Sequence, residues 1–261
     1  MEFQVPTMAE FASRGEAPDV LFWVGCAGSF DERAQKITRA VAKILHHAGV
    51  RFAVLGSEES CTGDPAKRAG NEFLFQMQAM MNIQVLNGYG VRKIVTACPH
   101  CFNTLKNEYP ELGGNYEVVH HSELLEKLFA EGKIKVQGGS FRGKKITFHD
   151  PCYLGRGNSV YEAPRSVLEK IDAEISEMKR SRAKGFCCGA GGAQMFKEPE
   201  KGNKDVNVER TEEALTLKPD YIAVGCPFCM TMMTDGVKNF NQEDSVKVLD
   251  IAELIAKAAD L

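Results

Sequence analysis

Short apolar runs alternate with amphipathic segments along the whole chain. In the first half, four runs have the length and apolar content of buried strands: residues 19–24, 51–55, 93–97 and 116–120. Four segments between and after them favour helices: residues 31–47, 71–86, 102–108 and 122–129. Strands that alternate with helices predict right-handed crossovers and a mostly parallel sheet.

The second half repeats this order of elements. Its expected strands are residues 145–148, 175–178, 221–224 and 246–249. Its expected helices are residues 161–171, 206–217 and 251–259. The pattern therefore predicts an α/β protein of two homologous domains, each a small, mostly parallel sheet flanked by helices.

Domain boundaries follow from the polar and glycine-containing stretches. Residues 1–18 are polar, contain two prolines, and are expected to form an N-terminal arm rather than a core element. The first domain is then residues 19–135 and the second is residues 145–261. Glycines within residues 132–145 make that stretch the expected linker.

The nine cysteines fall into two sets with the same spacing. The first set is Cys26, Cys61, Cys98 and Cys101, and the second is Cys152, Cys187, Cys188, Cys226 and Cys229. Thirty-five positions separate the first two members of each set (61 − 26 and 187 − 152), and each set ends in Cys-Pro-X-Cys. A repeat of 126 residues (152 − 26) is too long for a solenoid and indicates two related domains.

One position distinguishes the two sets. Thr62 stands where the second set has Cys188. Most of the cysteine-bearing segments follow the expected strands, and the carboxyl ends of parallel strands are where open α/β sheets gather ligand-binding loops. We therefore expect each set to converge on one site, with a five-thiol cage in the second half.

Thiolates select zinc, copper(I) or iron-sulfur clusters. A disulfide framework is not expected in a reducing cytosol. Structural zinc is closed by four ligands, so five converging cysteines favour an iron-sulfur cluster. Zinc, and a redox-active dithiol in Cys-Pro-X-Cys, remain the alternatives.

The doubled pattern of Cys, Cys-Cys-Gly and Cys-X-X-Cys resembles the cysteine-rich CCG domain of heterodisulfide reductase catalytic subunits. The same domain occurs in iron-sulfur subunits of glycolate, lactate and glycerol-3-phosphate oxidising complexes. Residues 59–68 and 149–156 are similar to heterodisulfide-reductase-related bacterial iron-sulfur oxidoreductases. The resemblance implies a noncubane [4Fe-4S] cluster held by five cysteines, here Cys152, Cys187, Cys188, Cys226 and Cys229.

The first set departs from the five-cysteine pattern. Cys26, Cys61, Cys98 and Cys101 could hold a [4Fe-4S] cubane, an altered cluster or a zinc ion. Relatives often carry a separate ferredoxin-like domain, which this sequence lacks. The resemblance therefore implies that electrons come from a ferredoxin-like iron-sulfur subunit or a flavoprotein subunit.

Catalysis is expected at the second site. Its candidate residues are Cys152, Cys187, Cys188 and His149, because His149 precedes the first cysteine of the set and could orient a ligand or move a proton. A hydrogen-bonded pair of His149 and Asp150 at a strand end is the structural alternative. His120 and Asp250 occupy matching strand ends, where a shared polar role is favoured over metal binding.

Two functional hypotheses follow. The first is a redox enzyme subunit that delivers electrons from a partner to a disulfide, a thiol pair or another acceptor. The second is a non-catalytic electron-transfer or structural module of a larger complex.

Charge and hydropathy narrow the location and partners. A net charge of −3 without a basic stripe gives no reason to expect nucleic-acid binding. The sequence has no apolar run of membrane-spanning length and no signal-peptide pattern. A cytoplasmic protein is expected, one that could dock on the inner face of the membrane through a membrane-bound redox partner.

Overall fold

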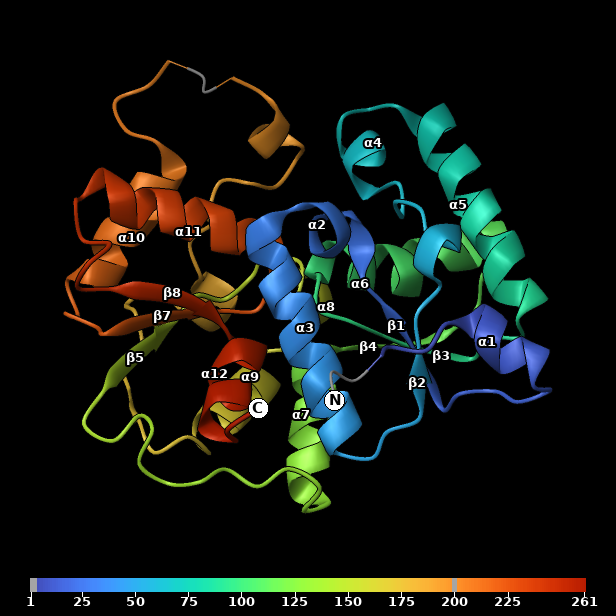
Figure 1. Ribbon diagram of the computed structural model, residues 1–261. Coiled ribbons are helices and arrows are strands. Elements are labelled where there is room, and N and C mark those ends of the chain that lie inside the picture. The colour runs from blue at the N-terminus through green and yellow to red at the C-terminus, as the bar shows by residue number, and fades with distance from the viewer. Residues whose placement is uncertain (1–3, 199–200) are drawn as a thin grey trace. The chain divides into compact units, whose positions relative to one another are not determined.

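Two four-stranded parallel sheets organise the chain in the computed structural model, which describes residues 4–198 and 201–261. One sheet lies in each of two compact units, Met1–Ile134 and Lys135–Leu261 (Figure 1). The α/β class, the parallel sheets and the flanking helices that the hydrophobic pattern predicts are confirmed.

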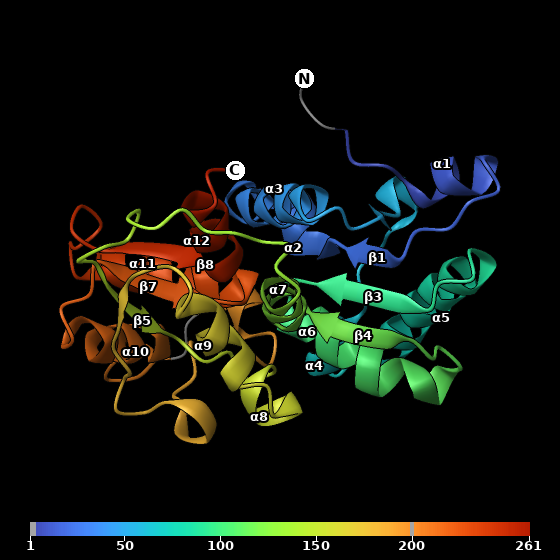
Figure 2. The same cartoon turned by 90° about the horizontal axis from the view of Figure 1, so that it is seen from below.

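In the first unit the strand order is β2-β1-β3-β4. The strands are β1 (Val20–Trp23), β2 (Phe52–Ala53), β3 (Lys93–Thr96) and β4 (Glu117–His120). β3 pairs in parallel with β4 from Lys93 opposite Glu117 to Thr96 opposite His120, and Figure 2 shows these two arrows side by side. All four residues of β1 are buried, as expected for a central parallel strand covered on both faces.

The second unit repeats this topology in the order β6-β5-β7-β8. Its strands are β5 (Lys145–Phe148), β6 (Glu174–Ile175), β7 (Tyr221–Val224) and β8 (Lys247–Asp250). In both units the second strand lies at one edge, beside the first, and the last strand lies at the other edge. The shared strand order agrees with the duplication that the cysteine spacing indicates.

Helices follow most of the strands. In the first unit they are α1 (Met8–Ser13), α2 (Gly25–Phe30), α3 (Glu32–His47), α4 (Asp64–Arg68), α5 (Glu72–Gly88), α6 (Pro99–Asn103) and α7 (His121–Ala130). In the second they are α8 (Gly155–Asn158), α9 (Glu162–Leu168), α10 (Val206–Leu215), α11 (Pro227–Asn239) and α12 (Ile251–Ala258). Helix α3 begins after Asp31, whose carboxylate accepts the Ala34 amide at 2.7 Å, and it buries the predicted apolar face.

The last helix of each unit begins with the same cap. His120 precedes α7 and Asp250 precedes α12, and each side chain accepts a backbone amide of the first turn. Glu123 and Glu253 complete the reciprocal half by accepting the cap residue's own amide at 2.9 Å. The shared polar role predicted for His120 and Asp250 is confirmed as helix capping.

Several features go beyond the sequence pattern, including α11 and the short helices α2, α4 and α8, which the pattern did not predict. The segment expected as an arm contains α1, with Met8 and Phe11 buried and the Met8 amide bonded to the Val54 carbonyl at 2.9 Å. The first three residues of that arm lie outside the described residues. The edge strands β2 and β6 are two residues long, shorter than expected, and each forms only two paired positions with its neighbour. The helix expected at residues 102–108 is a π-helical turn after α6.

Residues 4–198 and 201–261 contain no helix with the length and hydropathy that crossing a bilayer requires.

The contact between α10 and α11 generates a stability prediction. A Cβ added at Gly236 would meet the Thr211 hydroxyl at 2.0 Å. Gly236→Ala should therefore lower the free energy of unfolding by about 1–3 kcal/mol through overpacking. Gly88→Ala is the matched control, since that helical glycine has nothing within 4 Å, and it should leave stability unchanged or slightly higher. Urea denaturation followed by circular dichroism measures both, and equal effects would contradict the overpacking account.

Candidate metal centres

Each cysteine set lies at the carboxyl ends of strands in its own unit. In the first unit, Cys26 lies in α2 directly after β1, and Cys98 caps α6 directly after β3. In the second, Cys226 caps α11 directly after β7. The other members lie on neighbouring loops or in the first turns of these helices. Parallel pairing thus brings segments distant in sequence to one edge of each sheet.

The four thiols of the first unit are not joined by disulfides and interact in two pairs. Cys26 interacts with Cys61, and Cys101 interacts with Cys98, each contact raising a thiol pKa, and electrostatic interactions link the two pairs. Thr62 is 2% exposed, and its hydroxyl points at Cys101 Sγ from 3.9 Å. The residue that replaces the fifth cysteine therefore faces the same thiols.

The five thiols of the second unit form one continuous chain of contacts. Cys152 lies close enough to Cys187 to perturb its pKa, and Cys187 and Cys188 perturb each other in the same way. Cys188 Sγ lies 3.3 Å from Cys229 Sγ, and Cys229 hydrogen-bonds Cys226. The adjacent cysteines of the sequence therefore both point into one cluster.

A glycine turn supports each cluster. The Gly63 amide donates to Cys61 Sγ at 3.5 Å, and the Gly189 amide donates to Cys187 Sγ at 3.2 Å. Both glycines have positive φ, +88° and +94°, a backbone conformation that L side chains rarely adopt. An amide aimed at sulfur favours the thiolate.

Burial and mutual contact raise the pKa values of several of these thiols, whereas contact with Cys26 lowers the pKa of Cys61 to about 7. Contacts with Cys152 and Cys188 likewise hold the pKa of Cys187 well below its usual range. The pKa values of Cys101 and Cys229 lie well above the usual range, because each thiol hydrogen-bonds a neighbouring sulfur and is fully buried. The pKa of Cys188 is raised to about 12, chiefly by its contact with Cys187. All the thiols can ionise together only when metal cations balance their charge. The donor sets therefore fit a thiolate-bound metal group, with four candidate ligands in the first unit and five in the second.

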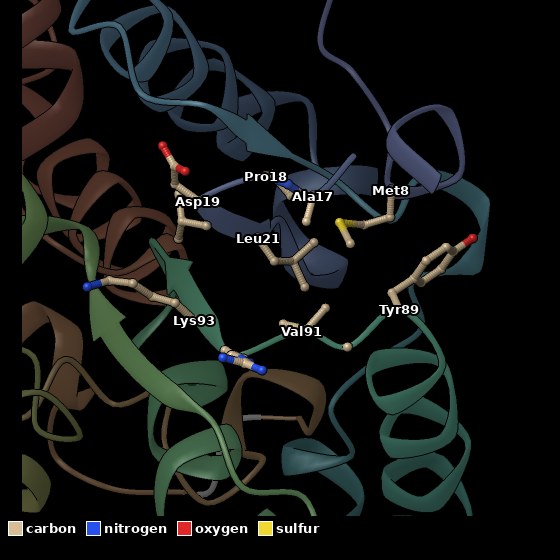
Figure 3. A pocket seen from close by; sticks show the side chains of 11 residues that line it. Met8, Ala17, Pro18, Asp19, Leu21, Tyr89, Val91 and Lys93 are labelled. Atoms are coloured by element: carbon tan, nitrogen blue, oxygen red, sulfur yellow. The ribbon is translucent and has the colours of Figure 1, made fainter. Parts of the chain in front are cut away.

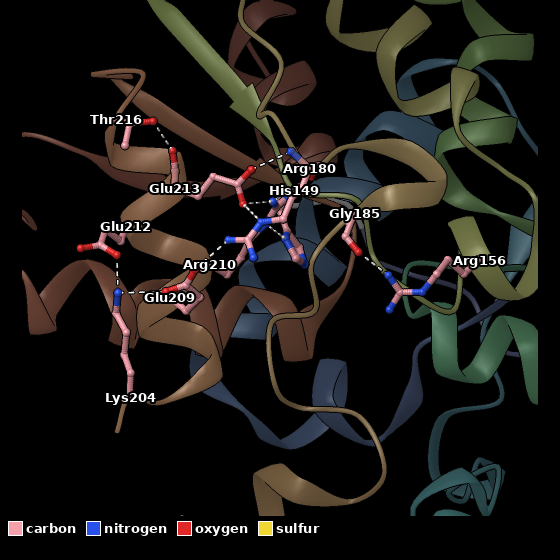
Figure 4. A network of polar contacts seen from close by, with 10 residues as sticks. All are labelled: His149, Arg156, Arg180, Gly185, Lys204, Glu209, Arg210, Glu212, Glu213 and Thr216. Atoms are coloured by element: carbon pink, nitrogen blue, oxygen red, sulfur yellow. Dashed lines mark hydrogen bonds and ion pairs between the residues drawn. The ribbon is translucent and has the colours of Figure 1, made fainter. Parts of the chain in front are cut away.

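His149 adds a nitrogen to the second cluster. One of its ring nitrogens lies within 4.8 Å of Cys188 Sγ and Cys229 Sγ, and the side chain is 1% exposed. Arg210 Nε donates to His149 Nδ1 at 3.0 Å (Figure 4). Burial, the main cause, and the charge of Arg210, the second, lower the pKa of His149 to about 3. The imidazole is therefore neutral at physiological pH.

Both halves of the chain match one family model. The cysteine-rich domain model, CCG, matches the chain twice, over residues 20–106 and 146–234. The chain belongs to the CCG family. The two matches include all nine cysteines. They leave out the two ends of the chain and the segment between the two halves.

Curated relatives of this CCG protein include redox proteins. It is 49% identical over 256 residues to the "Probable iron-sulfur-binding oxidoreductase FadF" of Bacillus subtilis, covering 98% of this chain and 36% of the relative. It is 46% identical to the EtfAB:quinone oxidoreductase of Syntrophomonas wolfei, covering 94% and 35%. It is 34% identical to a component of the dihydromethanophenazine:CoB–CoM heterodisulfide reductase of Methanosarcina barkeri, covering 93% and 59%. The chain thus spans about a third to three-fifths of these relatives.

Asp150, beside His149, organises the loops around the second CCG site. Its carboxylate accepts Arg165 Nη1 at 2.8 Å and Nη2 at 2.9 Å, and it also accepts the Arg182 amide at 2.8 Å. Arg165 is 4% exposed and also pairs with Glu177. Asp150 thereby ties the end of β5 to α9 and to the segment that leads into Cys187.

A corresponding buried network lies beside the first CCG site. His100 Nδ1 and Asp64 Oδ2 are 2.8 Å apart, and Arg68 Nε donates to Asp64 at 3.0 Å. Arg68 and Lys67 both pair with Glu108, from the π-helical turn. The cations of α4 are therefore engaged by acidic side chains.

Sequence reasoning missed the buried arginines. Arg165 and Arg210 lie in helices that the sequence predicts, but their burial depends on partners far along the chain. The only sequence signal for Arg210 is that three glutamates and one threonine surround it in residues 209–213. That pattern is equally typical of a helix face exposed to solvent.

A cavity of about 380 Å³ in the first unit is separate from the thiols. It is lined by residues that precede or begin β1 and β3, and Figure 3 shows Met8, Leu21 and Val91 around it. These are the amino ends of the strands, whereas the cysteines follow the carboxyl ends. No cysteine or histidine lines this cavity among the residues described for it, so it is no candidate for the metal chemistry.

Breaking the Asp150 pair should loosen the second site. Asp150→Asn leaves Arg165 with a reduced set of anionic partners, and we expect a loss of about 3 kcal/mol in unfolding free energy, the scale for breaking a buried pair. Asp220→Asn is the control, because that carboxylate pairs with Lys144 at the surface and its loss should matter little. Chemical denaturation compares the two variants. Equal stability of Asp150→Asn and the unchanged protein would show that the network does not hold these loops.

Proposed function

We propose that this chain is an iron-sulfur oxidoreductase subunit that passes electrons from a partner to a disulfide, a thiol pair or a related acceptor. The observation that carries the proposal is the unbroken chain of contacts among five thiols in the second unit. Zinc is closed by four ligands, whereas a multi-iron cluster can use the fifth. Names of the relatives, which include an iron-sulfur-binding oxidoreductase and a heterodisulfide reductase component, support it.

The two sites are assigned different groups. Cys152, Cys187, Cys188, Cys226 and Cys229 would hold a noncubane [4Fe-4S] cluster. Cys26, Cys61, Cys98 and Cys101 would hold a [4Fe-4S] cubane, with zinc as the alternative that metal analysis decides. When bound, such groups supply one-electron storage.

The chain's own residues shape the second site for this chemistry. Cys188 supplies the ligand that the first unit lacks, and the Gly189 amide donates toward Cys187 Sγ. A cavity of about 430 Å³ is lined by Gly189, by residues of 194–198 and 204–205, and by residues of α10 and α11. No cysteine or histidine is among the lining residues described for it, so an acceptor there would lie beside the turn that follows the paired cysteines and not against the thiols. Reducing a disulfide consumes two electrons and two protons and yields two thiols, so a partner must deliver two electrons in turn.

The partner is proposed from chemistry and from the relatives. A ferredoxin-like iron-sulfur subunit or a flavoprotein can deliver single electrons. A relative is named for EtfAB and quinone, and quinones dissolve in membranes. We propose that the chain acts in the cytoplasm and, when bound to a membrane redox complex, at the inner face of the membrane.

Ligand asymmetry can be tested by exchange between the units. Cys188→Ser should change the electron paramagnetic resonance (EPR) spectrum of the second cluster and abolish turnover, because a hydroxyl is a poor replacement for a soft thiolate. Thr62→Cys, the reciprocal variant, should be tolerated, since its side chain already faces the first thiols. Iron and zinc analysis after anaerobic reconstitution gives the metal content of the protein. Fewer than about four irons per chain would contradict the assignment of a [4Fe-4S] cluster. An unchanged spectrum for Cys188→Ser would show that Cys188 is not a ligand.

Substrate response separates catalysis from simple electron relay. Adding a disulfide or a thiol to the oxidised, reconstituted protein should alter the EPR spectrum of the second cluster, while the first cluster's signal stays the same. Cys188→Ser serves as the control that should lose the response. If neither disulfides nor thiols alter the spectrum, a non-catalytic electron-transfer module becomes the better account.

A further inference from the structure

We infer that His149 is a fixed hydrogen-bond donor to the sulfurs of the second site, with Arg210 as the residue that positions it, and that His149 is neither a metal ligand nor a proton carrier. The inference rests on the proposed function for the identity of the acceptor, a metal-bound sulfur. Its geometric basis is the contact between the Arg210 guanidinium and the imidazole (Figure 4).

The arginine contact fixes the proton on the ring. A guanidinium N–H can only donate, so the nitrogen that receives it must carry a lone pair. Arg210 Nε lies 3.0 Å from His149 Nδ1, which makes Nδ1 the acceptor and leaves the proton of the neutral ring on Nε2. The one lone pair of the neutral ring is thereby used, and the protonated Nε2 cannot bind a metal.

Arg210 is itself held in place. Its Nη1 donates to the Arg180 carbonyl at 2.8 Å and to Glu213 Oε2 at 2.9 Å, and the side chain is fully buried. Glu213 also accepts Arg180 Nε at 2.8 Å, so it has a second cationic partner. The guanidinium cannot turn away from His149 without breaking these contacts.

The donor on Nε2 lacks an acceptor within the described protein. His149 Nε2 is buried with no hydrogen-bond partner, while a ring nitrogen lies within 4.8 Å of the sulfurs of Cys188 and Cys229. Since Arg210 occupies Nδ1, Nε2 is the nitrogen left to those sulfurs. A buried N–H without a partner is costly, and an anionic sulfur would satisfy it.

The first unit supplies an independent parallel. Trp23 lies three residues before Cys26, as His149 lies three residues before Cys152. Trp23 Nε1 is also buried without a hydrogen-bond partner among the described residues. The indole nitrogen of tryptophan is a donor only. Both matching positions therefore carry an N–H donor. In His149, the contact with Arg210 is what fixes the proton on Nε2.

The donor has a measurable consequence. A hydrogen bond to a cluster sulfur stabilises the more negative, reduced state and raises the reduction potential. His149→Leu should therefore lower the midpoint potential of the second cluster. His149→Gln, whose amide N–H can replace Nε2–H, should keep it near the original value. Thr147→Val, a buried change on β5, the strand that ends just before His149, is the control and should leave the potential unchanged.

An EPR-monitored redox titration of the reconstituted full chain measures these potentials, and Arg210→Met should lower the potential as His149→Leu does. Histidine labelled with ¹⁵N then distinguishes a donor from a ligand by electron-nuclear double resonance. A donor gives weak nitrogen coupling and an exchangeable proton that His149→Leu removes. Strong coupling from a directly bound nitrogen, or equal potentials in His149→Leu and the unchanged protein, would overturn the inference.

Failure of the cluster assignment stays distinguishable. If metal analysis finds zinc and no iron, the proposed function fails, and the tautomer is read in the diamagnetic zinc-loaded chain by long-range ¹H–¹⁵N NMR. The proton on His149 Nε2 supports the inference even then. A proton on Nδ1 contradicts it whatever metal is bound.

Discussion

Mutual repulsion among buried thiolates is the constraint on which the rest of this structure depends. Nine sulfurs crowd into two clusters, and contact and burial together hold several of their pKa values above the usual range. Such clusters need cations, and they also need rigid walls, because the folded chain must hold groups that repel when ionised. The parallel sheets, the capped helices and the buried ion pairs around Asp150 and Asp64 provide those walls.

The fold was largely predictable from the sequence because its central strands are short runs dominated by apolar residues. Burial on both faces makes β1, β3, β5 and β7 visible without knowledge of their partners. The extents of β2 and β6 were less predictable, since only two residues of each pair with the neighbouring strand. Helix α1 was not predicted, because six residues of mixed polarity are ordered by contacts such as Met8 with Val54 rather than by their own pattern.

The candidate site divides in the same way. Cysteine spacing alone indicates which thiols belong together, because the same number of residues separates the first two cysteines of each half and both sets end in Cys-Pro-X-Cys. The buried ion pairs and hydrogen bonds that hold the thiol-bearing loops could not be predicted, because a buried charge is recognised by its partners in space and not by its neighbours in sequence. Arg210 meets His149 across 61 positions, and no periodicity of α10 distinguishes it from a solvated arginine. Long-range ion pairing is the physical information that a single sequence lacks.

The paired glycine turns have a bearing on how such sites diverge. At Gly63 and Gly189 the group that approaches sulfur belongs to the main chain, so side-chain replacement elsewhere in the cluster leaves it intact. A duplicated unit can then exchange a ligand, as Thr62 for cysteine, while its backbone continues to offer the same dipole to the neighbouring sulfur. Electrostatic support encoded in backbone conformation thus persists when a side chain of the thiol cluster changes, and two copies of one scaffold can present different donor sets, four thiols in one unit and five in the other.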